Sequence, residues 1–203
     1  MNFFITPVVK NLIILNLIVF LAYNVLGILP QGLLSMHTIG TDQFEPYQFV
    51  ASFFTHSDIS HILWNMILLM VFGRILEQMI DSKDFGIIYL ATGIGGIIFD
   101  QLVKLYLLDF QIPNDDPFLG SVGASGAVMG VIMALTTYNP NLELRFILIP
   151  IPIRIVYIAA FFVGKDVIAV INPQPEDLVA HFIHLGGAIT GFLMMKFWYK
   201  RFR

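Results

Sequence analysis

The chain places a serine and a histidine inside apolar segments of its C-terminal half. Ser125 lies in Gly123-Ala124-Ser125-Gly126, which opens one apolar stretch, and His184 lies inside another. A polar group in hydrocarbon is costly unless it is satisfied, so such residues within a membrane segment indicate function. A hydroxyl nucleophile with an imidazole base predicts acyl transfer. We therefore predict a protease that works within the bilayer.

Small residues accompany both groups at helical spacing. Gly126 and Gly130 are one turn apart, and Gly187 and Gly191 follow His184 on the same face. Two such smooth helices can approach closely and bring an imidazole within about 3 Å of a hydroxyl, the reach of a general base. Each motif alone also fits a packing face with a satisfied polar group. Their combination favours the catalytic interpretation.

A second polar group opens another apolar segment. His61 and Asn65 are four residues apart and share a helix face, so their N–H groups could donate to one developing oxyanion. Such a donor can supply about 2.7–4 kcal/mol of transition-state stabilisation. His56 alone fits a polar cap at the membrane surface. Asn65 lies one turn inside the helix and needs a partner.

The histidines also leave a metal site open as an alternative. His181 precedes His184 by three residues, and His56 and His61 could complete a set of ligands. Neither a buried carboxylate nor a cysteine is expected beside them, and Ser125 would have no role. We therefore expect no metal and no cofactor.

The composition requires a membrane protein. Hydrophobic residues make up 57% of the 203 residues and charged residues 12%, about half the share of a soluble domain. The mean hydropathy is +0.80. We predict one domain over residues 1–203 and an all-α fold with six membrane-spanning helices. The predicted spans are Val9 to Ile28, His61 to Met79, Gly86 to Leu107, Ser121 to Tyr138, Phe146 to Val163 and Leu178 to Trp198.

The charges predict the orientation. The side predicted to be cytoplasmic holds Lys10, Arg74, Lys83, Arg145, Arg154, Lys196, Lys200, Arg201 and Arg203. The outer side holds Asp42, Glu45, Asp58, Asp109, Asp115, Asp116, Asp166, Glu176 and Asp177, with Lys104 and Lys165. Both termini are then cytoplasmic, which requires an even number of spans. The absence of cysteine excludes thiol chemistry, and the net charge of −3 without a basic run gives no sign of nucleic acid.

Taken together, three motifs resemble the rhomboid family of intramembrane serine proteases over nearly the whole chain. They are His-x₄-His-x₃-Asn from His56 to Asn65, Gly-x-Ser-Gly from Gly123 to Gly126, and His-x₂-Gly-x₃-Gly from His184 to Gly191. The resemblance implies a six-helix bundle in which the serine's helix starts halfway down a water-filled cavity that opens outward.

The resemblance also implies roles for single residues. Ser125 would be the nucleophile and His184 the general base of a dyad, without a third carboxylate, because Asp177 lies above His184 and faces the outer surface. The accessory residues implied are His61 and Asn65 with the Ser125 N–H in the oxyanion hole, His56 at the cavity rim, and Gly123 and Gly126 around the nucleophile.

Two positions depart from the family's pattern. Tyr47-Gln48 stands where many members carry Trp-Arg, which removes a cation from the first outer loop. Met129 stands where an aromatic ring often stacks on the catalytic histidine. A methionine sulfur can contact an aromatic edge at about 0.3–1.5 kcal/mol, so Met129 is a partial substitute. Neither position does bond chemistry.

We therefore expect an endopeptidase whose partners are transmembrane protein substrates and membrane lipid, in a prokaryotic plasma membrane. One alternative is a rhomboid-like protein that binds clients without cutting them, which the intact Ser125 and His184 disfavour. Another is a small transporter that uses the histidines, for which we find neither inverted repeats nor buried carboxylates.

Overall fold

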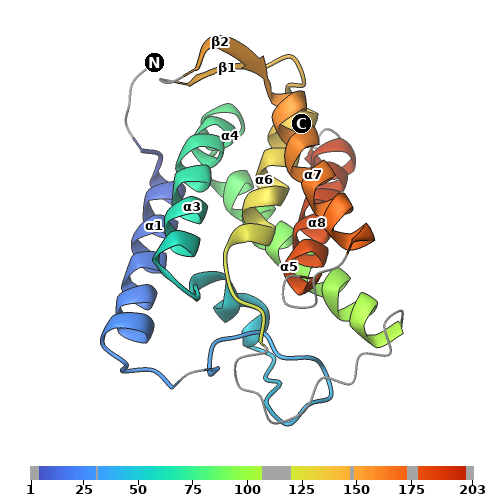
Figure 1. The fold of residues 1–203 in the computed structure, drawn as a ribbon. Coiled ribbons are helices and arrows are strands. Elements are labelled where there is room, and N and C mark those ends of the chain that lie inside the picture. The colour runs from blue at the N-terminus through green and yellow to red at the C-terminus, as the bar shows by residue number, and fades with distance from the viewer. Residues whose placement is uncertain (1–4, 31, 107–119, 147–148, 173–177, 200–203) are drawn as a thin grey trace.

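The computed structural model describes residues 5–30, 32–106, 120–146, 149–172 and 178–199. In these ranges, six helical rods pack into a bundle, which confirms the all-α prediction (Figure 1). The rods are α1 (Pro7–Phe20) with the π-helical turn η1 (Leu21–Val25); α3 (Ile59–Leu68), η3 (Leu69–Gly73) and α4 (Arg74–Met79) in line; α5 (Ser82–Tyr106); α6 (Ser125–Tyr138); α7 (Ile155–Ile171); and α8 (Leu178–Leu193) with η4 (Met194–Tyr199). The loop after α1 holds two short helices, α2 (Gln48–Ala51) and η2 (Ser52–Phe54).

The outer surface of the bundle is apolar. Among the described residues, three helices are long and apolar enough to cross a membrane, namely Pro7–Val25, Ile59–Met79 and Ser82–Leu105, and α6 is a shorter apolar helix. Large apolar side chains of α1 and α7 are exposed, including Ile18 at 57%, Phe161 at 67% and Ile171 at 70%. A surface of this kind is stable against lipid and not against water. The chain is an integral membrane protein.

The predicted fifth span was wrong at both ends. Residues before Arg154 form an antiparallel hairpin of β1 (Glu143–Phe146) and β2 (Ile149–Arg154), with Glu143 opposite Arg154. Pro150 and Pro152 exclude a helix interior there, because proline lacks the N–H and clashes with the preceding turn. The helix starts only at Ile155 and continues to Ile171, which places Asp166 inside it.

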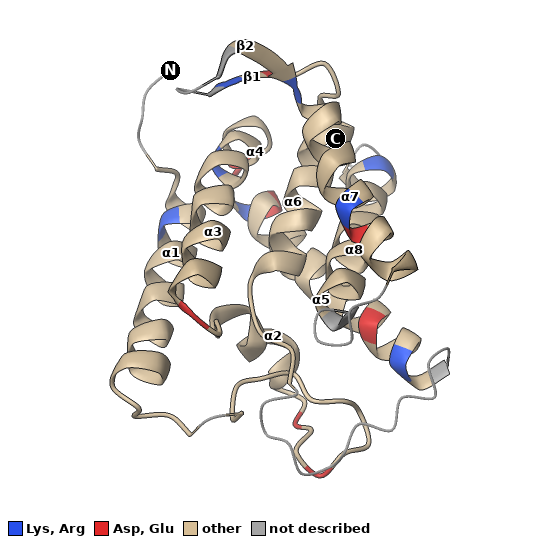
Figure 2. Cartoon of the chain, in the orientation of Figure 1, with Lys and Arg blue, Asp and Glu red and all other residues tan. Residues whose placement is uncertain are grey.

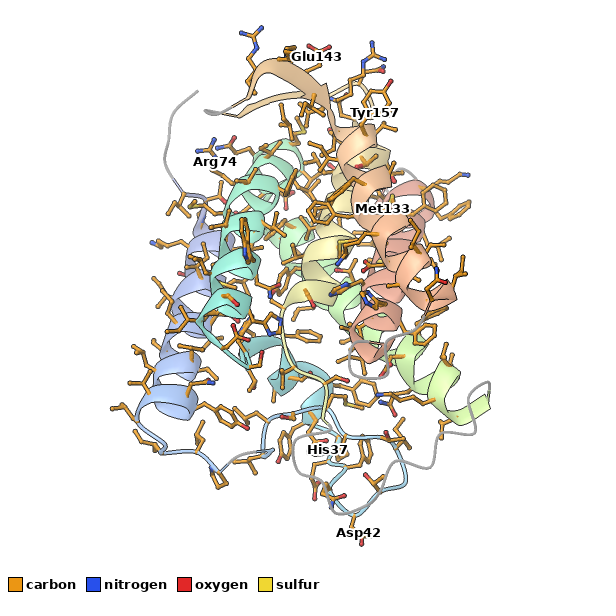
Figure 3. All side chains as sticks on the ribbon, viewed as in Figure 1. His37, Asp42, Arg74, Met133, Glu143 and Tyr157 are labelled. Carbon is orange, nitrogen blue, oxygen red and sulfur yellow. The ribbon has the colours of Figure 1, made fainter. Side chains whose placement is uncertain are left out.

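The polarity of the bundle agrees with the charge pattern over the described residues. Arg74 and Glu143 lie at the hairpin end, whereas His37 and Asp42 lie at the opposite end (Figure 3). Most described Lys and Arg lie in the half that carries the hairpin (Figure 2). Helix α1 begins and η4 ends towards that same end (Figure 1). Residues of the orientation prediction that lie outside the described ranges are Asp109, Asp115, Asp116, Glu176, Asp177, Lys200, Arg201 and Arg203.

The start of α1 is held by a carboxylate from another rod. Glu77 of α4 is 3% exposed, and its two oxygens accept the N–H groups of Val8 and Val9, each at 3.0 Å. The Ser82 hydroxyl donates to the same carboxylate at 2.6 Å. First-turn N–H groups lack intrahelical partners and lie at the positive end of the helix, so a buried carboxylate suits them.

Glu77→Leu is expected to destabilise the bundle, since it leaves two buried N–H groups without an acceptor. Each such group costs about 1–3 kcal/mol, so the unfolding transition in detergent should fall clearly below that of the wild type. Glu143→Gln is the control, because Glu143 is 52% exposed and 4.0 Å from Arg154, a pair of negligible strength. Equal stability of the two variants would contradict the anchoring role.

Helix α6 is largely buried in the bundle and packs against both α5 and α8, which also pack against each other (Figure 1). A Cβ added to Gly187 would meet the carbonyl oxygen of Gly126, and one added to Gly191 would meet that of Gly130. On the other side, a Cβ at Gly130 would meet the Thr92 side chain of α5. The backbones of α6 and α8 are therefore in direct contact, and their register is fixed by glycine, as predicted from the spacing.

Candidate active site

Gly123 sets the backbone that leads into Ser125. Its φ is +118°, its N–H donates to the Ser52 carbonyl at 2.9 Å, and a Cβ there would lie 2.7 Å from His61 Nε2. Both the left-handed φ and the approach of the ring require glycine. The chain therefore enters α6 with the His61 ring packed directly against the turn before Ser125.

Ser125 is the first residue of α6 and is partly buried. Ala124 occupies the N-cap, and no side chain caps the first turn. The N–H groups of that turn have no partner within the helix, and they form its positive end. They are suitable donors to a negative oxygen that develops beside Ser125.

The contacts between α6 and α8 bring the turn of Ser125 against the turn of His184. A Cβ at Gly126, next to Ser125, would lie 2.6 Å from Ile183 Cγ2 and 3.3 Å from the Ile183 carbonyl oxygen. Gly187, one turn after His184, touches the Gly126 carbonyl. The glycine spacing of the two motifs predicted this close approach of the helices. The contacts set the turns that carry Ser125 and His184, the candidate nucleophile and base, against each other.

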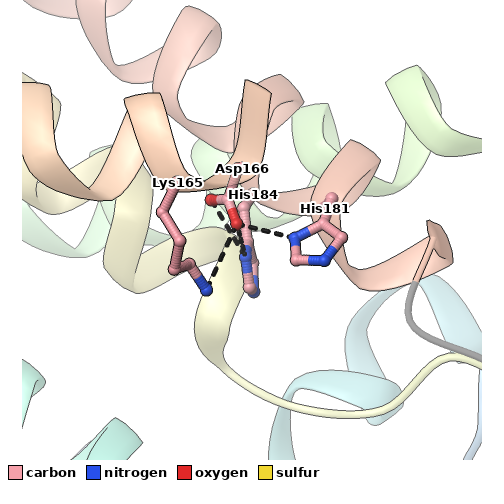
Figure 4. A network of polar contacts seen from close by, with 4 residues as sticks. All are labelled: Lys165, Asp166, His181 and His184. Carbon is pink, nitrogen blue, oxygen red and sulfur yellow. Dashed lines mark hydrogen bonds and ion pairs between the residues drawn. The ribbon is translucent and has the colours of Figure 1, made fainter. Parts of the chain in front are cut away.

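A carboxylate also lies beside His184, contrary to the prediction. Asp166 of α7 is 0% exposed. His184 Nδ1 lies 3.2 Å from Asp166 Oδ2 and 3.3 Å from Oδ1, and His181 Nδ1 lies 2.7 Å from Oδ1 (Figure 4). Lys165 Nζ is 3.4 Å from the same Oδ1. Asp166 is therefore the functional candidate that the sequence analysis does not identify, and Asp177 lies outside the described residues.

The carboxylate fixes the state of the imidazole. The Asp166 carboxylate can only accept a hydrogen bond, so the neutral His184 ring carries its proton on Nδ1 and leaves the Nε2 lone pair free. A base that takes the proton of a serine needs this tautomer. The arrangement supports His184 as the base and gives Asp166 a part in orienting it.

His61 belongs to a chain of hydrogen bonds that ends at the surface. Its Nδ1 lies 3.0 Å from the Ser57 hydroxyl, which lies 2.8 Å from Asp58 Oδ2. The Ser57 hydroxyl donates to Asp58, because a carboxylate only accepts. If the hydroxyl turns to donate to His61 Nδ1 instead, the proton of the neutral ring lies on Nε2, which faces Gly123. Only this state makes a neutral His61 an oxyanion donor.

Asp58 also starts α3, where its side chain accepts the His61 N–H at 2.9 Å. Hydrogen bonds from the Ser60 hydroxyl, the His61 N–H and the Ser57 hydroxyl hold the pKa of Asp58 well below its usual range. Asn65 has found its partner within its own helix, because its Nδ2 donates to the His61 carbonyl at 2.9 Å. Its side chain must rotate to serve an oxyanion.

His56 is not the surface cap that its position suggested. The ring is 0% exposed, packs edge-on against His61 with ring centres 4.9 Å apart, and accepts the Ala124 N–H on Nε2 at 3.5 Å. Burial, with a smaller effect of the like charge on His61, lowers the pKa of His56 to about 3. A neutral His56 therefore supports the turn before Ser125 by accepting the Ala124 N–H.

This shift makes the stability depend on pH. Between pH 6.5 and about 3 the unfolded chain binds a proton at residue 56 that the folded chain does not, so folding weakens by up to about 1.4 kcal/mol per pH unit as the pH falls. His56→Gln keeps an acceptor but takes up no proton. The wild type should therefore lose more stability between pH 7 and 4.5 than the variant does, measured as the unfolding transition in detergent. Parallel losses would contradict the shift.

Of the residues that depart from the family's pattern, Gln48 and Met129 lie inside the protein, whereas Tyr47 is 46% exposed. Gln48 is 2% exposed, and its Oε1 accepts the backbone N–H groups of His37 and Glu45 at 3.3 and 3.1 Å. It therefore organises the first loop from within and does not lie at a lipid surface. Met129 is 5% exposed and belongs to the main hydrophobic core.

A small cavity lies behind the serine's turn. Its volume is about 10 Å³, and Gly123, Gly126, Ser121 and Ile183 contribute to its wall. Among the described residues, Ser121 Oγ has no hydrogen-bond partner. The volume suits a single water molecule, which Ser121 could bind.

The sequence is similar to known proteins along most of its length. The family model described as "Rhomboid domain" matches residues 43–201. "RHOMBOID-like protein 12, mitochondrial" of Arabidopsis thaliana is 28% identical over 192 residues, which cover 89% of this chain and 55% of that protein. "Presenilin-associated rhomboid-like protein A, mitochondrial" of Danio rerio is 28% identical over 148 residues, which cover 70% of this chain and 35% of that protein. "Rhomboid-like protein 11, chloroplastic" of Arabidopsis thaliana is 27% identical over 161 residues, which cover 73% of this chain and 51% of that protein. The chain spans about a third to a half of the length of these relatives.

Proposed function

This chain belongs to the rhomboid family, and from that membership and its site we propose that it is an intramembrane serine endopeptidase. Its substrates are transmembrane proteins, cut near the outer membrane interface, where a helix can unwind into an extended strand. The observation that carries the proposal is the backbone contact between Gly126 and Gly187, which sets the turn of Ser125 against that of His184.

In the proposed reaction, Ser125 Oγ attacks the carbonyl carbon of the scissile bond while His184 Nε2 takes its proton. The oxyanion receives hydrogen bonds from the Ser125 N–H, from His61 in its Nε2–H state and from Asn65 after rotation. His184 then gives the proton to the leaving amine, and water hydrolyses the acyl-enzyme. No cofactor takes part.

We assign Asp166 a positioning role in this reaction. In Asp166→Asn the side-chain amide can donate to His184 Nδ1, which favours the tautomer without a free Nε2 lone pair. The equivalent change in a trypsin-like triad lowers kcat by about 10⁴-fold. We expect kcat to fall by up to that amount with KM little changed, measured on a fluorogenic transmembrane substrate in liposomes. The exposed loop carboxylate Asp42, changed to Asn, is the control. A fall in stability with kcat retained would leave Asp166 a purely structural residue.

The nucleophile is tested by labelling with a fluorophosphonate, which requires an activated serine. The folded wild type should be labelled at Ser125, as located by peptide mass spectrometry, and His184→Ala should not. Labelling at a different serine would contradict the proposal. If the folded wild type neither labels nor cuts, the alternative of a client-binding protein without catalysis is favoured, and a transmembrane helix cross-linked to the outer ends of α3 and α6 would support it.

The proposed location is a prokaryotic plasma membrane with both termini cytoplasmic. The distribution of Lys and Arg supports this orientation, while the relatives compared are named for mitochondria and chloroplasts. The chain has no cysteine, so single substitutions report topology cleanly. Asp42→Cys should react with an impermeant maleimide on intact cells and Glu143→Cys should not, and the reverse result would invert the orientation.

A further inference from the structure

The carboxylate that was missing from a metal site is present beside two histidines. Asp166, His181 and His184 each present a ligand atom, and these atoms all lie within 4.8 Å of one another. Both imidazoles reach the carboxylate through Nδ1, at 2.7 and 3.2 Å (Figure 4). Tetrahedral ligands at about 2.0–2.1 Å from an ion are about 3.3 Å apart. Small side-chain rotations therefore convert this hydrogen-bonded cluster into a coordination site.

The chemistry of the donors selects the kind of ion. Two imidazole nitrogens and one carboxylate oxygen suit Zn²⁺ and similar transition metals, whereas Ca²⁺ and Mg²⁺ prefer oxygen alone. The carboxylate is 1% exposed, and the two histidine side chains are 14% and 16% exposed. A buried anion needs compensation by a cation. Lys165 Nζ, 3.4 Å away on a side chain that is 52% exposed, offers only a weak one.

We infer that Asp166, His181 and His184 form a binding site for a divalent transition-metal ion, with Zn²⁺ as the reference case, and that the bound ion switches the protease off. The inhibitory part rests on the proposed function, whereas the binding part does not. A metal at Nδ1 needs the lone pair of that nitrogen, so the proton of the neutral ring moves to Nε2. His184 is then a donor at the atom that must accept the Ser125 proton.

His181 distinguishes this site from the catalytic one. It completes the set of three ligands, but it has no part in the proposed proton transfer. Lys165 has the opposite effect, because its charge competes with the ion for Asp166. His181→Ala should therefore weaken Zn²⁺ binding, and Lys165→Met should strengthen it.

The binding test uses the full chain in detergent, treated with EDTA and titrated with ZnCl₂ by calorimetry and by thermal unfolding. We expect one Zn²⁺ per chain and a higher unfolding temperature, with no effect of MgCl₂. Ser125→Ala should bind as the wild type does. His181→Ala and Asp166→Asn should bind at least about tenfold more weakly, and His37→Gln, at a histidine outside the cluster, should not. X-ray absorption should show nitrogen and oxygen ligands at about 2.0–2.1 Å.

The inhibition test measures the same variants on a transmembrane substrate. Zn²⁺ should inhibit the wild type at the concentration at which it binds, EDTA should restore the rate, and His181→Ala should need at least about tenfold more Zn²⁺. Binding that His181→Ala leaves unchanged would overturn the site. Binding without inhibition of an active enzyme would overturn the switch. Binding to a chain that cuts nothing would refute the protease and retain the site.

Discussion

Ser125→Ala and His184→Ala are each expected to abolish cleavage of a transmembrane substrate in liposomes. Loss of either group from a soluble serine protease lowers kcat by about 10⁶-fold. In the proposed site, no other group replaces Ser125 in the attack or His184 in the proton transfer. The two turns face each other through the contacts of Gly126 with Ile183 and Gly187. Ser125→Ala should keep the unfolding temperature of the wild type. His184→Ala should unfold at a lower temperature, because it removes a hydrogen bond to the buried Asp166, so its folded state is checked before activity is measured.

The double variant and the neighbouring histidine sharpen this test. Groups that act as a unit are not additive, so Ser125→Ala combined with His184→Ala should be no slower than either alone. His181→Ala should cut at a measurable rate, since His181 touches Asp166 and has no part in the proton transfer. If His184→Ala cut faster than His181→Ala, the general base would be His181 and not His184.

Gly187→Ala is expected to separate helices α6 and α8, which carry the candidate nucleophile and base. The added Cβ would meet the Gly126 carbonyl oxygen, which is backbone of α6 and cannot rotate away. Overpacking of a tight contact costs about 1–3 kcal/mol when side chains can adjust, and here the helices themselves must move. We expect a lower unfolding temperature together with nearly complete loss of cleavage, because the shift alters the position of His184 relative to Ser125.

Gly164→Ala provides the matched control. Gly164 lies in α7, and a Cβ there has no heavy atom within 4 Å. Alanine is also a better helix former than glycine by about 1 kcal/mol. This variant should unfold at the same temperature as the wild type or higher, with full activity. If Gly187→Ala behaved in the same way, the close approach of α6 and α8 would not set the site.

The catalytic candidates could be predicted from the sequence because their signals are local. The glycine spacing around Ser125 and His184 determines which helix faces meet, and a buried hydroxyl or imidazole within an apolar segment is conspicuous. That Asp166 lies inside a helix was not predicted, and the reason is also local. The predicted span ends at Val163, where Gly164, Lys165 and Asp166 interrupt the apolar run, although residues 167–171 are apolar again and continue the helix.

Hydrogen-bond partners could not be predicted in this way. Asn65 turns to the His61 carbonyl of its own helix, and the state of His61 depends on which way one exposed hydroxyl, that of Ser57, points. Gln48 likewise reads as a surface substitution in the sequence and is a buried organiser of the loop. Such choices depend on three-dimensional neighbours and on single protons, for which residue spacing carries no signal.

The enclosure of α6 also bears on how the protein is made. Residues 126–132, 134 and 135 of this helix are all buried, so in the folded bundle most of the helix contacts protein and not lipid. Membrane helices insert first and associate afterwards, and α6 gains its packing only in the second step, when α5 and α8 close around it. The turns of Ser125 and His184 come together at that moment and not before. In the protease that we propose, a newly synthesised chain would therefore not cut its neighbours in the membrane until its own assembly is complete.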